Sequence, residues 1–256
     1  MTGRHDGKVV VVTGGGGGIG AATCNAFARE GAKVAALDID ERLADAAARR
    51  LAEEGAEARA YRVDVTSSAE VDAVFADVQR DLGGIDVLVN SAGVSNVGDH
   101  TQDLSDEIWD LTIGVMQTGY FFCTRAAGRV MLEQRSGSVI HISSIRGFSP
   151  NPGRLAYCAS KAAVLMMAKV TAAEWAPYGV RVNAVAPGVE STPMWKRDVE
   201  LGLFDEQTYI DLIPAGRLGD PAEVGSLCSF LASDEASYIT GACVTIDGGL
   251  TSIPAG

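Results

Sequence analysis

The sequence predicts an α/β fold in which an open, doubly wound parallel β-sheet of about seven strands has helices on both faces. Short apolar runs of the kind found in buried strands alternate with longer stretches of helical periodicity along the chain. The first run ends at residues 14–18, which are all glycine and open a helix. No linker or internal repeat divides the 256 residues, so we expect a single domain over residues 1–256.

Each predicted strand is a short apolar run rich in β-branched residues, and each predicted helix follows the 3.6-residue period. In chain order, the strands are residues 8–13, 33–38, 58–65, 85–90, 138–142, 180–185 and 243–246. The helices are residues 19–30, 41–54, 71–81, 104–133, 156–175 and 221–231. Gly31 and Gly55 stop the first two helices, and Thr66 or Ser67 caps the third. Strands that alternate with helices imply right-handed crossovers and hence parallel pairing.

Composition and charge exclude several classes of protein. Hydrophobic residues make up 47% of the chain and charged ones 21%, as in a globular protein with a sizeable core. The five cysteines are scattered without Cys-x-x-Cys spacing, so we expect no disulfide framework, no metal site and a cytoplasmic location. Residues 1–8 are polar and no apolar run approaches roughly 20 residues, which predicts no membrane segment. The net charge of −12 opposes nucleic-acid binding.

In such a sheet, small molecules bind where the carboxyl ends of the strands meet, near the point where the strand order reverses. The informative residues of this sequence follow the predicted strands. They are the segment 14–20, Asp38, Asp64, the segment 90–93, Ser143 with Ser144, and the segment 187–192. We therefore expect six strand ends to face one crevice.

The glycine-rich segment predicts a phosphate-binding loop. Gly14, Gly18 and Gly20 open the first helix, where absent side chains let the backbone approach a pyrophosphate and the helix N-terminus favours negative charge. Gly15, Gly17 and Gly20 also fit a Gly-x-Gly-x-x-Gly pattern, since five consecutive glycines match almost any glycine template. A flexible turn is the alternative, but the position between a buried strand and a helix favours phosphate binding.

Asp38 ends the second predicted strand, where a carboxylate accepts hydrogen bonds from an adenosine ribose and repels a 2′-phosphate. No arginine or lysine lies at residues 15–18, and Ile39 follows Asp38, so a cation for a 2′-phosphate is missing from both expected places. The sequence therefore predicts NAD rather than NADP. Asp40 suits a helix cap.

Tyr157 and Lys161 form a Tyr-x-x-x-Lys pair in the helix predicted at 156–175, which places phenol and ammonium one turn apart on one face. A neutral phenol is a poor proton acceptor near neutrality, and a neighbouring fixed cation favours the phenolate. The pair predicts acid–base chemistry, although an isolated instance of so short a motif is common by chance.

Together these residues resemble the short-chain dehydrogenase/reductase family, in its short single-domain branch, over nearly the whole chain. The matching motifs are Thr13-Gly14-x-x-x-Gly18-Ile19-Gly20, Asp64-Val65, Asn90-Ser91-Ala92-Gly93, Ser144, Tyr157, Lys161, Asn183, and Pro187-Gly188 with Thr192. The resemblance implies a Rossmann-type sheet, hydride transfer between a nicotinamide and a carbonyl or alcohol carbon, and a homotetramer.

The resemblance also assigns roles. Tyr157 resembles the general base or acid, Ser144 the donor that holds the substrate oxygen, and Lys161 the residue that binds the nicotinamide ribose; Ser143 is the rival for Ser144. The implied cofactor contacts are Gly14, Gly17, Gly18, Ile19, Gly20, Asp38, Ile39, Asp64, Val65, Asn90, Ala92, Gly93, Tyr157, Lys161, Pro187, Gly188, Val189, Glu190 and Thr192. The N-terminal half would bind the cofactor, and residues 140–215 would hold the catalytic and substrate region.

The chain departs from the family at two positions. Met116 stands where the family's spacing implies an asparagine of a proton relay, and a thioether is a weak acceptor. Gln117, the backbone or an ordered water would substitute, and we expect turnover to survive because Tyr157 and Lys161 are intact. Glu190 replaces an aliphatic residue, and we expect its carboxylate to face solvent because glutamate is rarely buried unpaired.

Residues between the sixth strand and the helix at 221–231 form the most irregular apolar segment, which includes Met194, Trp195, Leu203 and Phe204. It predicts a lid, with packing against a neighbouring subunit as the alternative. Phe148 and residues 94–97 would add walls to the pocket. These side chains favour an apolar or cyclic secondary alcohol or ketone.

Other polar residues carry weaker predictions. Arg146 and Arg154 flank the same loop and would suit a carboxylate, but solvated surface arginines are the commoner case. His5, His100 and His141 lack metal-ligand spacing, which favours core or surface roles.

The leading interpretation is an NAD(H)-dependent oxidoreductase that acts on a secondary alcohol or ketone through Ser144, Tyr157 and Lys161. One alternative is an NAD-binding protein of this fold with weak or lost catalysis, which Met116 motivates. Another is an NADP-dependent 3-oxoacyl-thioester reductase, which Asp38 opposes.

Overall fold

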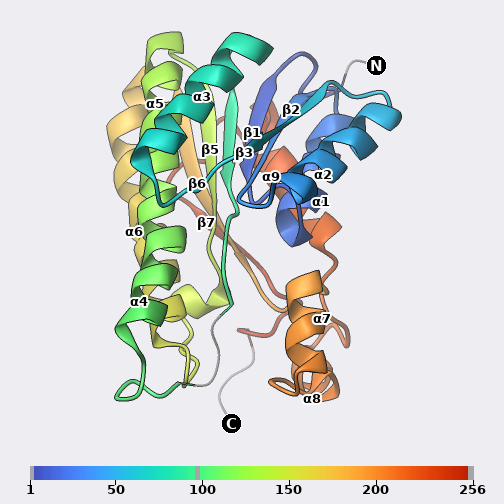
Figure 1. The fold of residues 1–256 in the computed structure, drawn as a ribbon, viewed down its shortest axis with the longest axis vertical. Coiled ribbons are helices and arrows are strands. Elements are labelled where there is room, and N and C mark those ends of the chain that lie inside the picture. The colour runs from blue at the N-terminus through green and yellow to red at the C-terminus, as the bar shows by residue number, and fades with distance from the viewer. Residues whose placement is uncertain (1–2, 96–98, 253–256) are drawn as a thin grey trace.

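The computed structural model describes residues 3–95 and 99–252, which form three layers (Figure 1). The middle layer is a parallel sheet of seven strands in the order β3-β2-β1-β4-β5-β6-β7. The strands are β1 (Val9–Thr13), β2 (Lys33–Asp38), β3 (Ala58–Arg62), β4 (Val87–Asn90), β5 (Gly137–Ile142), β6 (Val180–Pro187) and β7 (Cys243–Ile246). The predicted doubly wound Rossmann-type fold is confirmed, with the reversal of strand order between β1 and β4.

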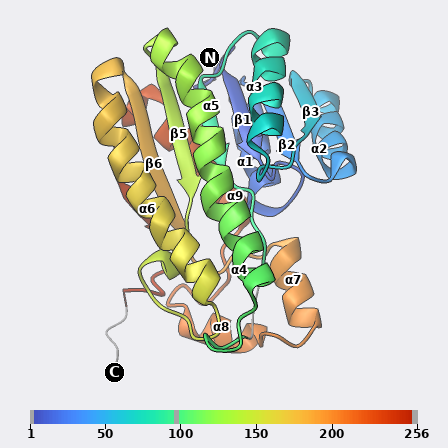
Figure 2. The same cartoon turned by 60° about the vertical axis from the view of Figure 1, so that its left-hand side comes forward.

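Helices cover both faces of the sheet because alternate strand residues point to opposite sides. On one side are α1 (Gly18–Arg29), α2 (Glu41–Glu53) and α9 (Pro221–Ala232), which pack on Val10, Val12 and their neighbours. On the other are α3 (Ser68–Leu82), α5 (Gly119–Gln134) and α6 (Leu155–Trp175), which pack on Val9, Val11 and theirs. Figure 2 shows α5 and α6 side by side over the sheet.

The long helix predicted at 104–133 is interrupted. It begins as α4 (Asp106–Ile113), passes through a π-helical turn at Gly114–Thr118 and continues as α5. A π-helical turn inserts one residue and rotates the side chains that follow it, and such turns are frequent at functional sites. Met116 lies in this turn.

The segment predicted to be irregular is largely helical, which corrects that expectation. Residues Pro193–Glu200 form α7 and Glu206–Leu212 form α8. Thr192 caps α7 by accepting a hydrogen bond from the Trp195 N–H, and Asp205 caps α8 in the same way through Thr208. Figures 1 and 2 show both helices beyond the carboxyl ends of the strands, apart from the other helices.

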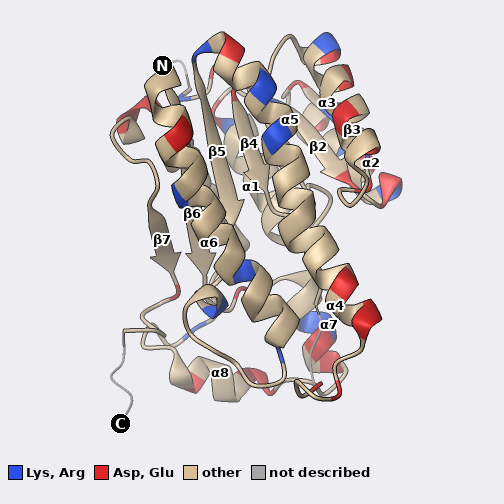
Figure 3. Ribbon diagram, turned by 90° about the vertical axis from the view of Figure 1, so that its left-hand side faces the viewer, with Lys and Arg blue, Asp and Glu red and all other residues tan. Residues whose placement is uncertain are grey.

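One helix among the described residues, Leu155–Tyr178, is long and apolar enough to cross a membrane by length and composition. It is α6 with the short 3₁₀ turn that follows. One face of α6 packs against β6 and α4, as in the core helix of a layered domain. Lys161, Lys169 and Glu174 interrupt it, so the sequence shows no unbroken apolar run. Figure 3 shows few charged residues on the outer side of α6.

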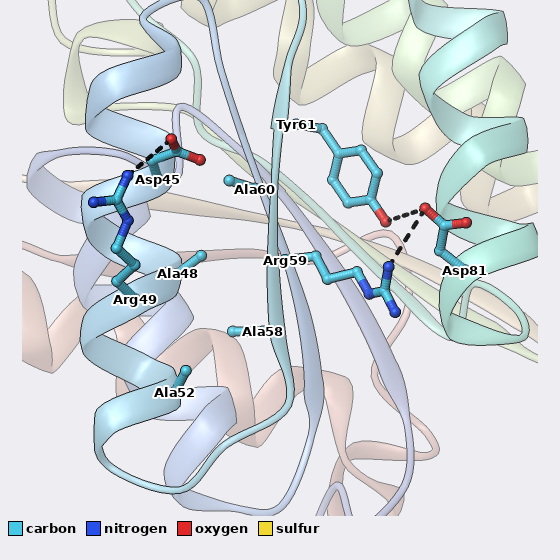
Figure 4. A pocket seen from close by; sticks show the side chains of 9 residues that line it. All are labelled: Asp45, Ala48, Arg49, Ala52, Ala58, Arg59, Ala60, Tyr61 and Asp81. Atoms are coloured by element: carbon cyan, nitrogen blue, oxygen red, sulfur yellow. Dashed lines mark hydrogen bonds and ion pairs between the residues drawn. The ribbon is translucent and has the colours of Figure 1, made fainter.

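A surface hollow of about 350 Å³ lies beside the edge strand β3, away from the residues predicted for the site (Figure 4). Its polar side chains satisfy one another, since Arg49 pairs with Asp45 and both Tyr61 and Arg59 reach Asp81. Charged side chains along an edge strand oppose pairing with another chain. The hollow therefore fits edge protection better than ligand binding.

Candidate functional site

The glycine loop between β1 and α1 adopts backbone conformations that only glycine adopts readily. Gly14 and Gly18 have φ of +67° and +51°. A Cβ on Gly20 would lie 2.0 Å from the Gly14 carbonyl oxygen, whereas a Cβ on Gly17 would meet nothing within 4 Å. Gly17 precedes α1 and has no side chain with which to cap it, so no capping side chain occupies the start of the helix. This geometry suits a phosphate group.

Asp38 at the end of β2 is bound to the glycine loop. Its Oδ2 accepts a hydrogen bond from the Gly16 N–H at 3.1 Å, and its Oδ1 accepts one from the Asp40 N–H at 3.1 Å. Ile39 beside it is 57% exposed, so an apolar surface lies next to the carboxylate. Asp40 caps α2 through the Arg42 N–H, which confirms its predicted role.

The ends of β3 and β4 contribute mainly backbone. Asp64 accepts hydrogen bonds from the N–H and hydroxyl of Thr66. Val65 is buried and packs against Gly119, where a Cβ would lie 2.8 Å from a Val65 methyl carbon. Asn90 is fully buried and donates to the Thr124 hydroxyl, so its side chain belongs to the core.

Thr13 is part of the glycine motif but had no predicted role of its own. It holds the end of β1 to the loop after β4. Its buried Oγ1 accepts hydrogen bonds from the N–H groups of Ser91 and Ala92, at 3.0 and 3.2 Å. A Cβ on Gly14 would lie 2.9 Å from the Ala92 Cα. The glycine loop and residues 91–93 therefore form one continuous surface, and Gly93 is exposed on it.

The segment after β6 completes this surface from the other side. A Cβ on Gly188 would lie 2.8 Å from the Asp247 Cα, so this glycine permits close backbone packing after Pro187. A Cβ on Gly18 would lie 3.6 Å from Thr192 Cβ, so the segment 187–192 passes beside the glycine loop. The two sets of predicted cofactor residues therefore meet.

Glu190 was expected to face solvent, and the structure shows that this is wrong. The residue is 7% exposed, and its carboxylate packs against Gly219, whose missing side chain leaves room for it. Its Oε2 is buried without a hydrogen-bond partner. Burial raises the pKa of Glu190 to about 7, with nearby Glu223 acting in the same direction. The backbone of residues 189 and 190 pairs with Gly219, which fixes the segment.

We expect Glu190→Gln to raise the free energy of unfolding at pH 8 by about 1–3 kcal/mol. The folded-state pKa lies above the usual 4.5, so the wild-type protein loses stability as pH rises from 4.5 to about 7. The amide does not ionise and should remove this loss. Urea unfolding at pH 5 and pH 8 measures it, with the exposed Glu200→Gln as control. An equal effect of the two substitutions at pH 8 would contradict the buried-charge explanation.

The two serines after β5 have different partners. Ser143 donates its hydroxyl to the Lys161 carbonyl oxygen at 2.8 Å, which commits it to holding α6. Ser144 Oγ accepts a hydrogen bond from the Arg146 N–H at 3.1 Å, so its own proton is free to be donated. The arrangement favours Ser144 over Ser143 as the substrate-binding hydroxyl.

Lys161 lies buried behind Tyr157. Its Nζ is 5.7 Å from the centre of the Tyr157 ring and donates to the Ile142 carbonyl oxygen at 2.8 Å. Burial lowers the pKa of Lys161 to about 7. The ammonium therefore has a fixed position close to the phenol, as the Tyr-x-x-x-Lys spacing predicts.

Tyr120 is a contact of Lys161 that the sequence analysis missed. Lys161 Nζ donates to the Tyr120 hydroxyl at 3.4 Å, and that hydroxyl donates to the Ile142 carbonyl oxygen at 3.2 Å. Met116, one turn before Tyr120, is fully buried, and a Cβ on Gly93 would lie 3.6 Å from its sulfur. Tyr120 thus places a hydroxyl beside the lysine, and the Ile142 carbonyl oxygen that also contacts the lysine belongs to the backbone, one of the substitutes expected together with Gln117 and water.

The apolar residues expected to form a lid pack mainly on one another. Trp195 stacks on Phe204 with ring centres 5.1 Å apart, and Tyr209 meets both rings edge-on. Met194 and Leu203 are about two-fifths exposed. We call the segment from Thr192 to Leu212 the cap. Ser95 ties it to the loop after β4 by donating to the buried Asp198 at 2.7 Å.

Phe148 is half exposed near the same end of the sheet, and Val97 lies outside the described residues. His5 and His141 are buried, which confirms core roles, and His100 is exposed. His141 stacks on Tyr120, and burial lowers its pKa to about 3. Among the described residues no cluster of metal-ligating side chains is found.

Known proteins resemble this chain along almost its whole length. A family model described as enoyl-(acyl carrier protein) reductase matches residues 14–251. The 2-(S)-hydroxypropyl-CoM dehydrogenase 3 of Xanthobacter autotrophicus is 38% identical and aligns over 99% of this chain and 100% of its own. The 2,5-dichloro-2,5-cyclohexadiene-1,4-diol dehydrogenase of Sphingobium indicum is 40% identical and aligns over 97% of this chain and 98% of its own.

A reductase and a solved dehydrogenase structure are also similar to this chain. The 3-oxoacyl-[acyl-carrier-protein] reductase of Thermotoga maritima is 41% identical over 96% of this chain and 99% of its own. A solved structure of NAD⁺-bound xylitol dehydrogenase superimposes with a TM-score of 0.91 at 35% identity, covering 96% and 99% of the two chains. The chain belongs to the short-chain dehydrogenase/reductase family.

Proposed function

We propose that this protein is an NAD-dependent dehydrogenase that transfers a hydride between nicotinamide and the carbinol or carbonyl carbon of a secondary alcohol or ketone. The observation that carries the proposal is the buried Lys161 ammonium, 5.7 Å from the centre of the Tyr157 ring. Relatives that act on alcohols and diols support the reaction type. The apolar side chains near the site favour a substrate with an apolar or cyclic body.

The residues of the crevice fit a dinucleotide. Open space beside Gly17 and the uncapped start of α1 suit a pyrophosphate, and the carboxylate of Asp38 suits the hydroxyls of an adenosine ribose. Ile39 presents an exposed apolar side chain for the adenine. When bound, the nicotinamide supplies the hydride acceptor or donor.

In alcohol oxidation, Tyr157 as phenolate would take the hydroxyl proton of the substrate, while Ser144 donates a hydrogen bond to the same oxygen. Lys161 would favour the phenolate through its positive charge and position the ring by lying behind it. Tyr120 and the Ile142 carbonyl oxygen hold the ammonium in place. In ketone reduction, Tyr157 would return the proton.

We expect NADH to bind at least about tenfold more tightly than NADPH, because Asp38 would repel a 2′-phosphate. Fluorescence titration of the purified protein with each nucleotide measures the difference. Asp38→Asn removes the charge but keeps the shape, so the preference should shrink in this variant. A wild-type preference for NADPH would show that the Asp38 carboxylate does not select the cofactor.

A second candidate is an NADP-dependent 3-oxoacyl-thioester reductase, which the 41% identical acyl-carrier-protein reductase favours. Asp38 weighs against it, and the same titration discriminates. A protein that only binds NAD is the remaining alternative. It is weakened by the intact Tyr157–Lys161 pair, and a wide alcohol screen without turnover would support it.

We also propose a cytoplasmic homotetramer. The five cysteines are all free thiols. Phe121 on α5 and Met166 and Val170 on α6 are about half exposed on neighbouring helices, an apolar surface that subunit contact would bury. Light scattering of the purified protein gives the assembly size.

A further inference from the structure

Arg154 lies between the catalytic tyrosine and the cap. It directly precedes α6, and its guanidinium carbon is 4.4 Å from the centre of the Tyr157 ring. The same carbon is 5.8 Å from the centre of the Phe204 ring, which belongs to the cap. The two aromatic contacts hold a positive charge near the position of the substrate hydroxyl, if Tyr157 takes the proton of that hydroxyl.

This arginine lacks the partners that comparable arginines have. Among residues 3–95 and 99–252, four arginines are half-buried: Arg125, Arg146, Arg154 and Arg181. Three of them donate side-chain hydrogen bonds, to the Ser68 hydroxyl, the Pro150 carbonyl oxygen and the carbonyl oxygens around Leu231 respectively. Within the described part of the chain none of the four forms an ion pair, but Arg154 alone also donates no side-chain hydrogen bond, and its Nε, like that of Arg125, is buried without an acceptor.

The Nε–H of Arg154 is buried without an acceptor, which is unfavourable because a donor removed from water without an acceptor keeps its desolvation cost. Arg154 is also the residue at the N-terminus of α6, and its side chain makes no hydrogen bond to that helix. The positive end of this 21-residue helix dipole adds to the charge of the guanidinium. Both features favour a negatively charged ligand.

We infer that Arg154 binds an oxyanion of the substrate, so that the substrate is a hydroxy or keto acid with an apolar body. This inference rests on the proposed function, because it takes the carbon beside Tyr157 and Ser144 as the reacting one. The guanidinium donates two N–H groups to the oxyanion, while Phe204 covers its face from the cap. The apolar body then lies among the side chains of the pocket, and the acid group lies at its edge.

A different role for Arg154 would be purely electrostatic. A cation stacked on the Tyr157 ring favours the phenolate whatever the substrate, in the same way as Lys161. Loss of Arg154 would then slow acidic and neutral substrates equally. The two roles therefore differ in selectivity and not in rate alone.

The test compares kcat/KM for 3-hydroxycyclohexanecarboxylate with that for its primary amide. In the wild-type protein the acid should be preferred by about 10–100-fold, the range of a charge-assisted hydrogen-bonded pair. Arg154→Gln should bring the ratio close to one, and Arg154→Lys should keep part of it. Arg146→Gln is the matched control, since it removes a half-buried arginine of the same loop, and it should leave the ratio unchanged. A ratio that Arg154→Gln leaves unaltered, or an equal loss for acid and amide, overturns the inference.

A binding measurement separates this inference from the proposed reaction. Calorimetric titration with cyclohexanecarboxylate, in the presence of NADH, should show binding to wild type and at least tenfold weaker binding to Arg154→Gln, with cyclohexanecarboxamide indifferent to the substitution. Binding that depends on Arg154 without any turnover would support the oxyanion site and contradict the proposed dehydrogenase activity. Turnover of the amide, together with carboxylate binding that is the same in wild type and Arg154→Gln, would support the dehydrogenase activity and contradict the oxyanion site.

Discussion

Replacing Tyr157 with phenylalanine is expected to lower kcat for a secondary alcohol by about 10²–10⁴-fold, the contribution of a positioned general acid or base. The substitution deletes only the hydroxyl, so the ring that contacts Lys161 and Arg154 stays in place. NADH binding should change little, because most predicted contacts with the dinucleotide lie elsewhere in the crevice. Steady-state kinetics and fluorescence titration on the same preparation separate the two effects.

Tyr178→Phe is a suitable control because Tyr178 is 45% exposed at the far end of the helix. It should leave kcat within about twofold of wild type, as a surface substitution does. If Tyr157→Phe retained a tenth or more of wild-type kcat, another group would have to move the proton, and the role assigned to Tyr157 would fall.

Replacing Lys161 with methionine is expected to abolish most turnover while making the protein more stable. Burial lowers the pKa of Lys161 from its usual 10.5 to about 7, so below pH 7 the folded protein contains a desolvated ammonium. A methionine of similar shape avoids that cost and loses the hydrogen bonds to Ile142 and Tyr120. We expect a net gain of about 1–3 kcal/mol in the free energy of unfolding at pH 6.

The gain should depend on pH in a defined direction. Because the folded pKa lies below the unfolded one, wild-type stability rises as pH increases from about 7 to 10.5, and the variant lacks this rise. The difference between the two proteins should therefore shrink at pH 9. Urea unfolding at pH 6 and 9 measures it, with the exposed Lys169→Met on the same helix as control. If the variant were less stable than wild type at pH 6, the hydrogen bonds of Lys161 would contribute more to stability than the burial of its charge costs.

Much of the fold could be predicted because local signals and global packing agree. The strands at 33–38 and 243–246 have the predicted bounds, and the glycines after the first two helices stop them where expected. β3 ends three residues early, at Arg62, whereas β6 continues to Pro187, where its partner is Ile246 of β7. Strand ends depend on the neighbouring strand, which local sequence does not specify. The cap was misjudged because its helices have eight and seven residues, too short for a clear period.

The location of a candidate residue could be predicted where local sequence decides it, as for the glycine loop after β1 and for Asp38 at the end of β2. The surroundings of a residue could not be predicted where they depend on residues distant in the sequence. Glu190 is buried because Gly219 leaves room for it, which the general tendency of glutamate does not show. Tyr120 reaches Lys161 because a π-helical turn precedes it, and one extra residue in a helix has no sequence signature.

Two side-chain contacts among the described residues join the cap to the body of the protein. Ser95 donates to Asp198 of α7, and Arg154 packs on Phe204 between α7 and α8. We expect opening of the cap to require both contacts to separate, because loss of one leaves the other in place. We therefore expect product to dissociate more slowly with both contacts in place than with only one of them.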